Sequence, residues 1–169
     1  WNHLPLVQYI IILFMFLAGS NFVLSYFALT GKINKVIKDD EFKTFLSLVL
    51  FFSLTVFIII YTSVNLNNSY FENTHVFGKL EGSIRHSLFQ VLAIITTTGF
   101  VTADYTAWTP FLTILFFGFM FLGGSAGSTS GGIKVVRHLL MLKGGILEFK
   151  RSLHPNAIIQ PRYNGKVVN

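Results

Sequence analysis

The sequence predicts an all-α membrane protein whose repeating unit is a membrane span, a re-entrant helix, a tight turn and a second span. Of the 169 residues, 52% are hydrophobic and only 12% are charged, a balance that a soluble domain of this length could hardly solvate. Long apolar runs alternate with polar segments that carry lysine. One apolar run, of about thirteen residues, is too short to cross a bilayer and ends in three threonines.

The first part of the chain contains two predicted spans. Residues 1–29 form the first, with Pro5 where the first turn of a helix tolerates proline. Residues 30–43 are a polar linker rich in lysine, which the positive-inside rule places on the cytoplasmic side. Residues 44–64 form the second span. Residues 65–82 contain one lysine and are predicted to be an outer loop.

A short helix and an interrupted span follow. Residues 83–95 are predicted to be a re-entrant pore helix, whose C-terminal end would turn the negative end of the helix dipole toward a cation. Residues 110–141 are predicted to be a span interrupted by glycines. Residues 142–169 are basic and polar and are predicted to be a cytoplasmic connector. The complete pore-forming unit therefore covers residues 44–141.

The chain also repeats itself. Residues 14–20 match residues 119–125 at six of seven positions, and Pro5 matches Pro110 at the same shift of 105 residues. Membrane transport folds are often built from such internal repeats. We therefore expect the first span to be the last span of one unit and the second span to begin the next unit.

The segment from Thr96 to Phe100 is the candidate cation-binding site. Non-helical backbone at membrane depth survives only where it lines a cavity, and in a potassium channel filter carbonyl oxygens replace the hydration shell of the ion. We expect the backbone oxygens of Thr97, Thr98, Gly99 and Phe100 to bind K⁺, with the Thr96 hydroxyl at the inner mouth. A single glycine predicts looser discrimination against sodium than in a filter with two. The alternative is a threonine-rich turn between packed helices.

The run from Gly123 to Gly132 is the candidate gate. It mixes five glycines with small polar residues, and each glycine costs a helix about 1 kcal/mol relative to alanine, so the run is expected to unwind the span. It begins roughly 20 Å along the helix from Pro110, in the inner half of the membrane. The alternative is a helix whose small residues serve close packing. The residues assigned to the gate are Gly123, Gly124, Gly127, Gly131, Gly132 and Lys134.

Several charged residues flank these two segments. Lys134 either repels cations at the inner mouth while the loop is closed or, with Arg137, anchors the chain at the membrane interface. Asp104 follows the filter and either concentrates cations outside or caps a turn. Three more residues, near the start of the re-entrant helix, are expected to form a solvated helix end: Glu81, Arg85 and His86.

The chain resembles the TrkH/KtrB superfamily of potassium transporters, of the Trk branch. The residues that carry the resemblance are Thr96-Thr97-Thr98-Gly99-Phe100, Thr102-Ala103-Asp104-Tyr105, the run from Gly123 to Lys134, His154-Pro155-Asn156-Ala157 and Arg162-Tyr163-Asn164-Gly165. The resemblance implies four such units around one pore, of which this chain is a fragment: the end of the second and all of the third.

The resemblance also implies a setting and partners. The expected location is the cell inner membrane, which a multi-pass chain crosses in contact with lipid. The expected partners are the remaining repeats of the same polypeptide, a second copy of the complete subunit in a homodimer, and a cytoplasmic nucleotide-binding regulatory subunit of the TrkA kind. The transported ion is K⁺, with no cofactor.

Two other classes of function fit parts of the sequence. Gly127 and Gly132 have the spacing of a phosphate-binding loop, but Ile133 stands where that loop requires lysine. A non-conducting structural membrane subunit would not need the threonine and glycine run. No paired carboxylates, catalytic triad or metal cluster occur at usable spacing, so we expect no enzyme. Lysines beside apolar segments do not indicate nucleic-acid binding.

Overall fold

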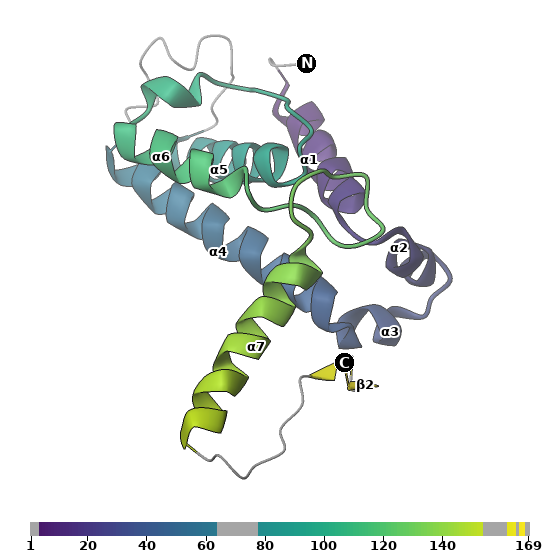
Figure 1. Cartoon of the computed structure of the whole chain (residues 1–169). Coiled ribbons are helices and arrows are strands. Elements are labelled where there is room, and N and C mark those ends of the chain that lie inside the picture. Colours follow the sequence, from purple (N-terminus) through teal and green to yellow (C-terminus); the bar gives the residue numbers. More distant parts are fainter. Residues whose placement is uncertain (1–3, 64–77, 154–161, 165, 168–169) are drawn as a thin grey trace.

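The computed structural model describes residues 4–63, 78–153, 162–164 and 166–167. Within these residues the fold is almost entirely helical, which confirms the predicted fold class (Figure 1). A two-stranded hairpin near the C-terminus is the exception. The elements are α1 (Pro5–Gly19), α2 (Phe22–Leu29), α3 (Ile33–Lys38), α4 (Asp40–Ser63), α5 (Lys79–Ile95), η2 (Tyr105–Ala107), α6 (Pro110–Phe119), α7 (Val135–Leu153), β1 (Arg162–Tyr163) and β2 (Lys166–Val167).

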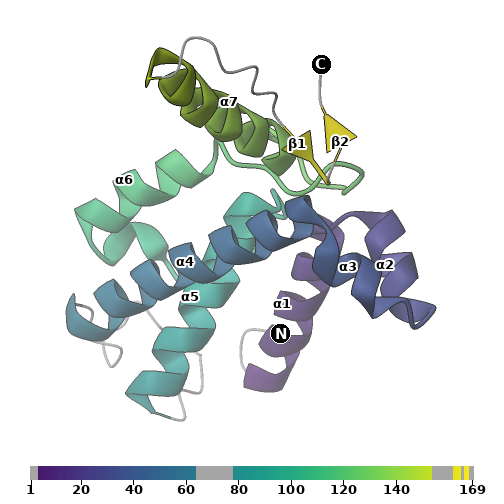
Figure 2. The same ribbon diagram turned by 90° about the horizontal axis from the view of Figure 1, so that it is seen from below.

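Helix α4 is the longest helix and lies at the centre of the packing. Its 24 residues extend about 36 Å, enough to cross a bilayer core of about 30 Å. It begins at Asp40, inside the segment predicted to be a linker, because acidic residues stabilise a helix N-terminus. Helix α5 packs against it (Figure 2). Side chains three or four residues apart form the buried stripe of α4: Phe45, Val49, Ser53, Val56 and Ile60.

The first apolar segment is two helices, where we predicted one span over residues 1–29. Helices α1 and α2 meet at a bend of 116°. Ser20 has extended backbone, and the Asn21 side chain accepts a hydrogen bond from the N–H of Val23, which caps the new helix. At 15 residues α1 is about 22 Å long, shorter than a bilayer core. The prediction of a single span is therefore corrected to a broken one.

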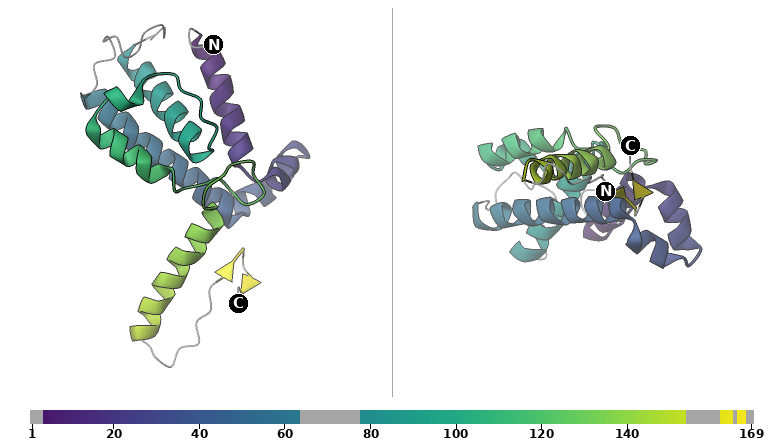
Figure 3. Two further views of the ribbon diagram at one scale, coloured as in Figure 1. Left: turned by 45° about the horizontal axis from the view of Figure 1, so that its top comes forward. Right: turned by 60° about the horizontal axis from the view of Figure 1, so that its bottom comes forward.

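The later boundaries also differ in part from the predicted ones. Helix α5 ends at Ile95 as expected but starts at Lys79, four residues before the predicted start at residue 83. Most of the predicted outer loop, residues 65–77, lies outside the described residues. Helix α7 continues to Leu153, so the predicted connector begins as a helix. Figure 3 shows α7 projecting away from the bundle formed by α1, α4, α5 and α6.

Candidate functional site

The candidate filter is a tight turn tied to the last turn of α5. The N–H of Thr97 donates to the carbonyl of Ile94 at 3.0 Å, and the N–H groups of Thr98 and Gly99 both donate to the carbonyl of Ala93, at 3.0 and 3.4 Å. Helix α5 therefore fixes where the turn begins. Residues 97–100 are exposed on the surface of this chain.

Two residues of this turn have left-handed backbone. Thr97 has φ 54° and Gly99 has φ 76°. Glycine adopts such angles without steric cost, which agrees with the conformation expected at Gly99. For a β-branched residue a positive φ is a genuine outlier, and strained backbone of this kind clusters at functional sites. Nothing in the residue pattern indicates this conformation at Thr97.

The threonine hydroxyls hold the turn in place. The Thr96 side chain is 5% exposed, and its hydroxyl donates to the carbonyl of Leu92 at 2.7 Å. The same oxygen lies 2.7 Å from the hydroxyl of Thr98. The Thr97 hydroxyl accepts a hydrogen bond from the N–H of Gly131 at 2.8 Å. The filter turn is thus in direct contact with the candidate gate.

The glycine loop, residues 120–134, connects α6 to α7. Helix α6 ends at Phe119, somewhat before the glycines that were expected to interrupt it. The loop closes on itself, because the N–H of Gly123 donates to the carbonyl of Ile133 at 2.9 Å and the N–H of Val135 donates to the carbonyl of Gly124 at 3.1 Å. Two further glycines assigned to the gate have positive φ: Gly127 at 73° and Gly132 at 72°.

The glycine loop also contacts the break between α1 and α2. The N–H of Ser125 donates to the carbonyl of Gly19 at 2.9 Å, and the N–H of Thr129 donates to the carbonyl of Ala18 at 3.2 Å. In return the N–H of Phe22 donates to the carbonyl of Gly127 at 3.3 Å. Gly19 and Gly124 are equivalent residues of the internal repeat, and they lie against each other, although Gly19 ends α1 while Gly124 lies in the loop beyond the end of α6.

Lys134 folds back onto the glycine loop. Its half-buried ammonium group donates to the carbonyl of Ser130 and lies 3.4 Å from the carbonyl of Ser128. Arg137, one turn further along α7, is exposed. Lys134 is therefore a tether within the loop as well as a positive charge beside it.

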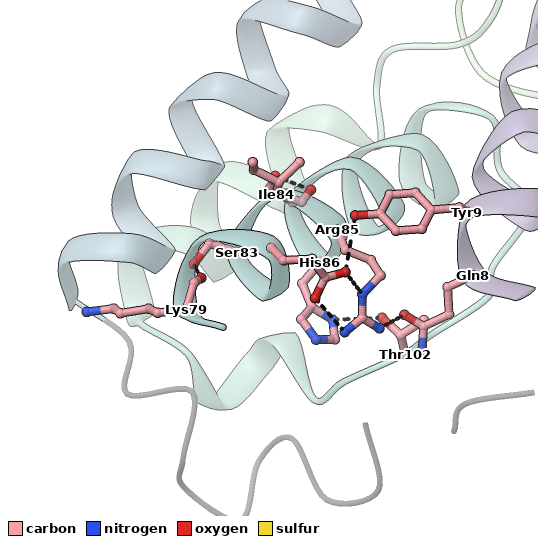
Figure 4. A network of polar contacts seen from close by, with 10 residues as sticks. Gln8, Tyr9, Lys79, Ser83, Ile84, Arg85, His86 and Thr102 are labelled. Atoms are coloured by element: carbon pink, nitrogen blue, oxygen red, sulfur yellow. Dashed lines mark hydrogen bonds and ion pairs between the residues drawn. The ribbon is translucent and has the colours of Figure 1, made fainter. Parts of the chain in front are cut away.

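Three residues expected to form a solvated helix end are buried or partly buried instead (Figure 4). Arg85 is 0% exposed; its guanidinium donates to Gln8 of α1 and forms an ion pair with Glu81 at 2.8 Å. Tyr9 donates to the same carboxylate at 3.1 Å. The prediction was wrong because α1 covers this face of α5, and the amide of Gln8, itself 0% exposed, lies against the guanidinium.

The segment after the filter is fixed by a second pair of contacts. His86, also 0% exposed, has its Nδ1 atom 3.2 Å from the hydroxyl of Thr102, and its ring meets the edge of Trp108. Asp104 caps the short helix η2: its carboxylate accepts from the N–H of Thr106 at 3.1 Å and from the hydroxyl at 2.5 Å. The hydroxyl bond from Thr106 holds the pKa of Asp104 below its ordinary value.

Other kinds of site find little support here. Across the described ranges, no group of three or more His, Asp or Glu side chains could hold a metal ion. A cavity of about 250 Å³ lies beside the filter turn, but mainly apolar side chains line it.

Comparison with known proteins gives a consistent result. The family described as "TrkH: Cation transport protein" matches residues 1–169. The "Trk system potassium uptake protein TrkH" of Escherichia coli K12 is 38% identical over 155 residues, 91% of this chain and 30% of that protein. The protein of the same name from Halomonas elongata is 44% identical over 110 residues, 65% of this chain and 21% of that protein.

A solved structure has the same fold. The crystal structure of the potassium transporter TrkH from Vibrio parahaemolyticus superposes with a TM-score of 0.83 and 28% sequence identity. The match covers 98% of this chain and 34% of that chain. The present chain thus spans about a third of the length of the proteins that it matches.

Proposed function

The chain belongs to the TrkH family of cation transport proteins, and from this premise we propose that it forms one part of a potassium pathway through the membrane. The relatives carry the name of potassium uptake proteins. Because they are about three times as long, the pathway is completed by further repeats of a longer polypeptide. That polypeptide is a multi-pass protein of the cell inner membrane, forms a homodimer and binds a cytoplasmic nucleotide-binding regulatory subunit.

In this proposal residues 96–100 are the filter. The backbone oxygens of Thr97, Thr98, Gly99 and Phe100 bind K⁺ in place of water. Positive φ at Thr97 and Gly99, with Thr98 between them, supports this assignment, because alternating backbone handedness turns successive carbonyls toward one side. The strain at Thr97 also supports a functional role over that of an ordinary turn.

The glycine loop is the gate beneath this filter. The observation that carries the assignment is the hydrogen bond from Gly131 to the Thr97 hydroxyl, which brings the loop directly against the filter turn. A loop of small residues between two helices has few packed side chains, and such segments have low local stability and two accessible arrangements. One arrangement obstructs the pathway and the other opens it.

The filter is tested by Gly99→Ser in the full-length protein. A side chain at φ 76° strains the turn and displaces the carbonyl row, so potassium selectivity should fall by about tenfold. The measurement is rubidium uptake into vesicles in competition with sodium. Gly31→Ser, at φ 77° in the linker before α3, is the matched control. If sodium competes with rubidium uptake in Gly99→Ser as it does in the wild type, Gly99 is only a turn residue.

The gate is tested by deleting residues 124–131 from the full-length protein. Rubidium flux at matched protein amounts should rise several-fold, because the obstruction is gone while the filter remains. A folded deletion mutant that conducts no better than the wild type would return the glycines to a helix-packing role. A mutant and a wild type that both fail to conduct would favour a structural membrane subunit.

A further inference from the structure

Glu41 is a buried carboxylate at the start of α4, and it joins two segments far apart in the sequence. The residue is 3% exposed. Its Oε1 atom accepts a hydrogen bond from the N–H of Ala126 in the glycine loop at 2.5 Å. Its Oε2 atom accepts one from the hydroxyl of Tyr163 in β1 at 3.2 Å. One carboxylate therefore links the glycine loop to the C-terminal hairpin.

The hairpin formed by β1 and β2 is attached to the same end of α4. The N–H of Asp40 donates to the Asn164 side chain at 2.8 Å, and the Asn164 amide donates to the carboxylate of Asp39 at 2.7 Å. Asn164 has φ 47° and precedes a glycine, a pair that favours tight hairpin turns. Tyr163 and Asn164 of the Arg-Tyr-Asn-Gly motif thus contact three consecutive acidic residues, Asp39, Asp40 and Glu41.

The hydrogen bonds to the Glu41 carboxylate are expected to be stronger than most other hydrogen bonds of the glycine loop. Hydrogen bonds to an ionised acceptor are roughly twice as strong as those between neutral groups, and a buried carboxylate that loses a donor carries a desolvation cost. The carboxylate of Glu41 is the charged acceptor that the described contacts give to the loop backbone. The remaining contacts of the loop are mainly with neutral backbone and hydroxyl groups.

We propose that the hairpin of residues 162–167 is a latch that holds the glycine loop in its closed arrangement through Glu41. This inference rests on the loop acting as the gate. Docked, the hairpin supplies Tyr163 to one carboxylate oxygen and fixes the other oxygen on Ala126. When a cytoplasmic partner pulls the hairpin away, Glu41 loses a donor and its place at the end of α4 opens to water. The hold on Ala126 then weakens, and the loop is released.

The test measures loop opening separately from ion flux. Ser125 is 1% exposed, and its hydroxyl has no hydrogen-bond partner among the described residues, so Ser125→Cys is a conservative probe. In full-length protein with no other cysteine, the rate of alkylation by N-ethylmaleimide reports opening of the loop.

Two variants weaken the latch and a third is the control. Tyr163→Phe removes only the hydrogen bond from the tyrosine hydroxyl to Glu41. Asp39→Asn loosens the hairpin while an oxygen remains to cap α4 at Phe42. Tyr26→Phe, on exposed α2, is the control.

Both latch variants should raise the alkylation rate several-fold and leave the control unchanged, because a hairpin that undocks lets water reach Glu41 and compete for its hydrogen bond with Ala126. Rubidium flux into vesicles should rise with it. Faster alkylation without more flux would support the latch and refute the gate. Unchanged alkylation in both folded variants would overturn the latch and leave the gate proposal standing.

Discussion

The two ends of helix α5 are held in different ways. At the end where α5 begins, Arg85 is 0% exposed and donates to the buried Gln8 of α1 (Figure 4) and to the partly exposed Glu81 of its own helix, so three side chains share one network. At the other end, in the part of the chain that the structure describes, the turn after α5 meets the glycine loop through the hydrogen bond from the N–H of Gly131 to the Thr97 hydroxyl. The first end is held by an ion pair and its hydrogen bonds, whereas the second end contacts the loop through a hydrogen bond between neutral groups.

This difference suits the start of α5 to a fixed position and its end to a position where neighbouring contacts can change. A buried ion pair contributes little net stability, but removing one partner is costly because it leaves an uncompensated charge. Such a network therefore suits a position that must not move. A loop joined to its neighbours mainly by backbone hydrogen bonds can exchange them with water at small cost. The start of α5 thus serves as an anchor, while the end next to the loop stays free to respond.

Removing the anchor should have the largest effect. Arg85→Met in the full-length protein removes the guanidinium that donates to the partly exposed Glu81 carboxylate and to the buried Gln8 amide, so we expect a loss of about 1 to 3 kcal/mol and a clear fall in the temperature of unfolding. The measurement is thermal unfolding in detergent followed by size-exclusion fluorescence. Arg137→Met, at an exposed site on α7, is the control. Equal unfolding temperatures would mean that the network is not an anchor.

Loosening the loop should have an intermediate effect, on flux and not on folding. Lys134→Gln weakens the tether to Ser128 and Ser130 and removes a positive charge, so basal rubidium flux should rise several-fold. Arg137→Gln removes the same charge from an exposed site and should change flux less. Equal effects, or none, at the two positions would make both residues interfacial anchors.

The smallest effect is expected at Asp104. Asp104→Asn keeps an oxygen to cap η2 but removes the charge, so half-saturation for potassium should rise about twofold at low ionic strength and the difference should vanish in high salt. Because the hydrogen bond from Thr106 lowers the pKa of Asp104, the wild-type carboxylate stays charged as the pH falls through the ordinary range for aspartate. Uptake by the wild type should therefore keep this advantage at about pH 4, where an ordinary aspartate is roughly half protonated. A difference that persists in high salt would make Asp104 a structural cap.

Local chemistry was predictable around the filter, and strain was not. The positive φ at Gly99 follows from its place in a turn, because glycine alone adopts it freely. Nothing in the sequence identifies Thr97 as the second such residue, because threonine normally avoids that conformation. The hydrogen bond from the N–H of Gly131 holds the Thr97 side chain while the Thr97 backbone has this positive φ.

The break between α1 and α2 could have been read from the internal repeat. Residues 14–20 match a segment that was expected to unwind, yet the first copy was predicted to run straight on as a span. Asn21, a strong N-cap residue, marks the start of the second helix. The repeat and the N-cap residue were both given too little weight, because the apolar composition of residues 4–29 predicts a span but does not indicate where a helix breaks.

Contacts between distant residues could not have been predicted. The burial of Arg85 depends on Gln8, 77 residues earlier, and the role of Glu41 depends on Ala126, 85 residues later. Each residue alone reads as a surface charge. A lone glutamine in an apolar run was the one hint, because an amide in such a place needs a partner.

Gly19 is the last residue of α1, in the first copy of the repeat, and it lies against Thr96 of the following unit. A β-carbon built on Gly19 would lie 2.6 Å from the Thr96 side chain, at the base of the filter turn. The conformation of the candidate filter turn therefore depends on residues from both copies of the repeat. Chimeras that exchange filter segments between relatives should work only when the matching helix end is exchanged with them, and divergence at either place constrains the other.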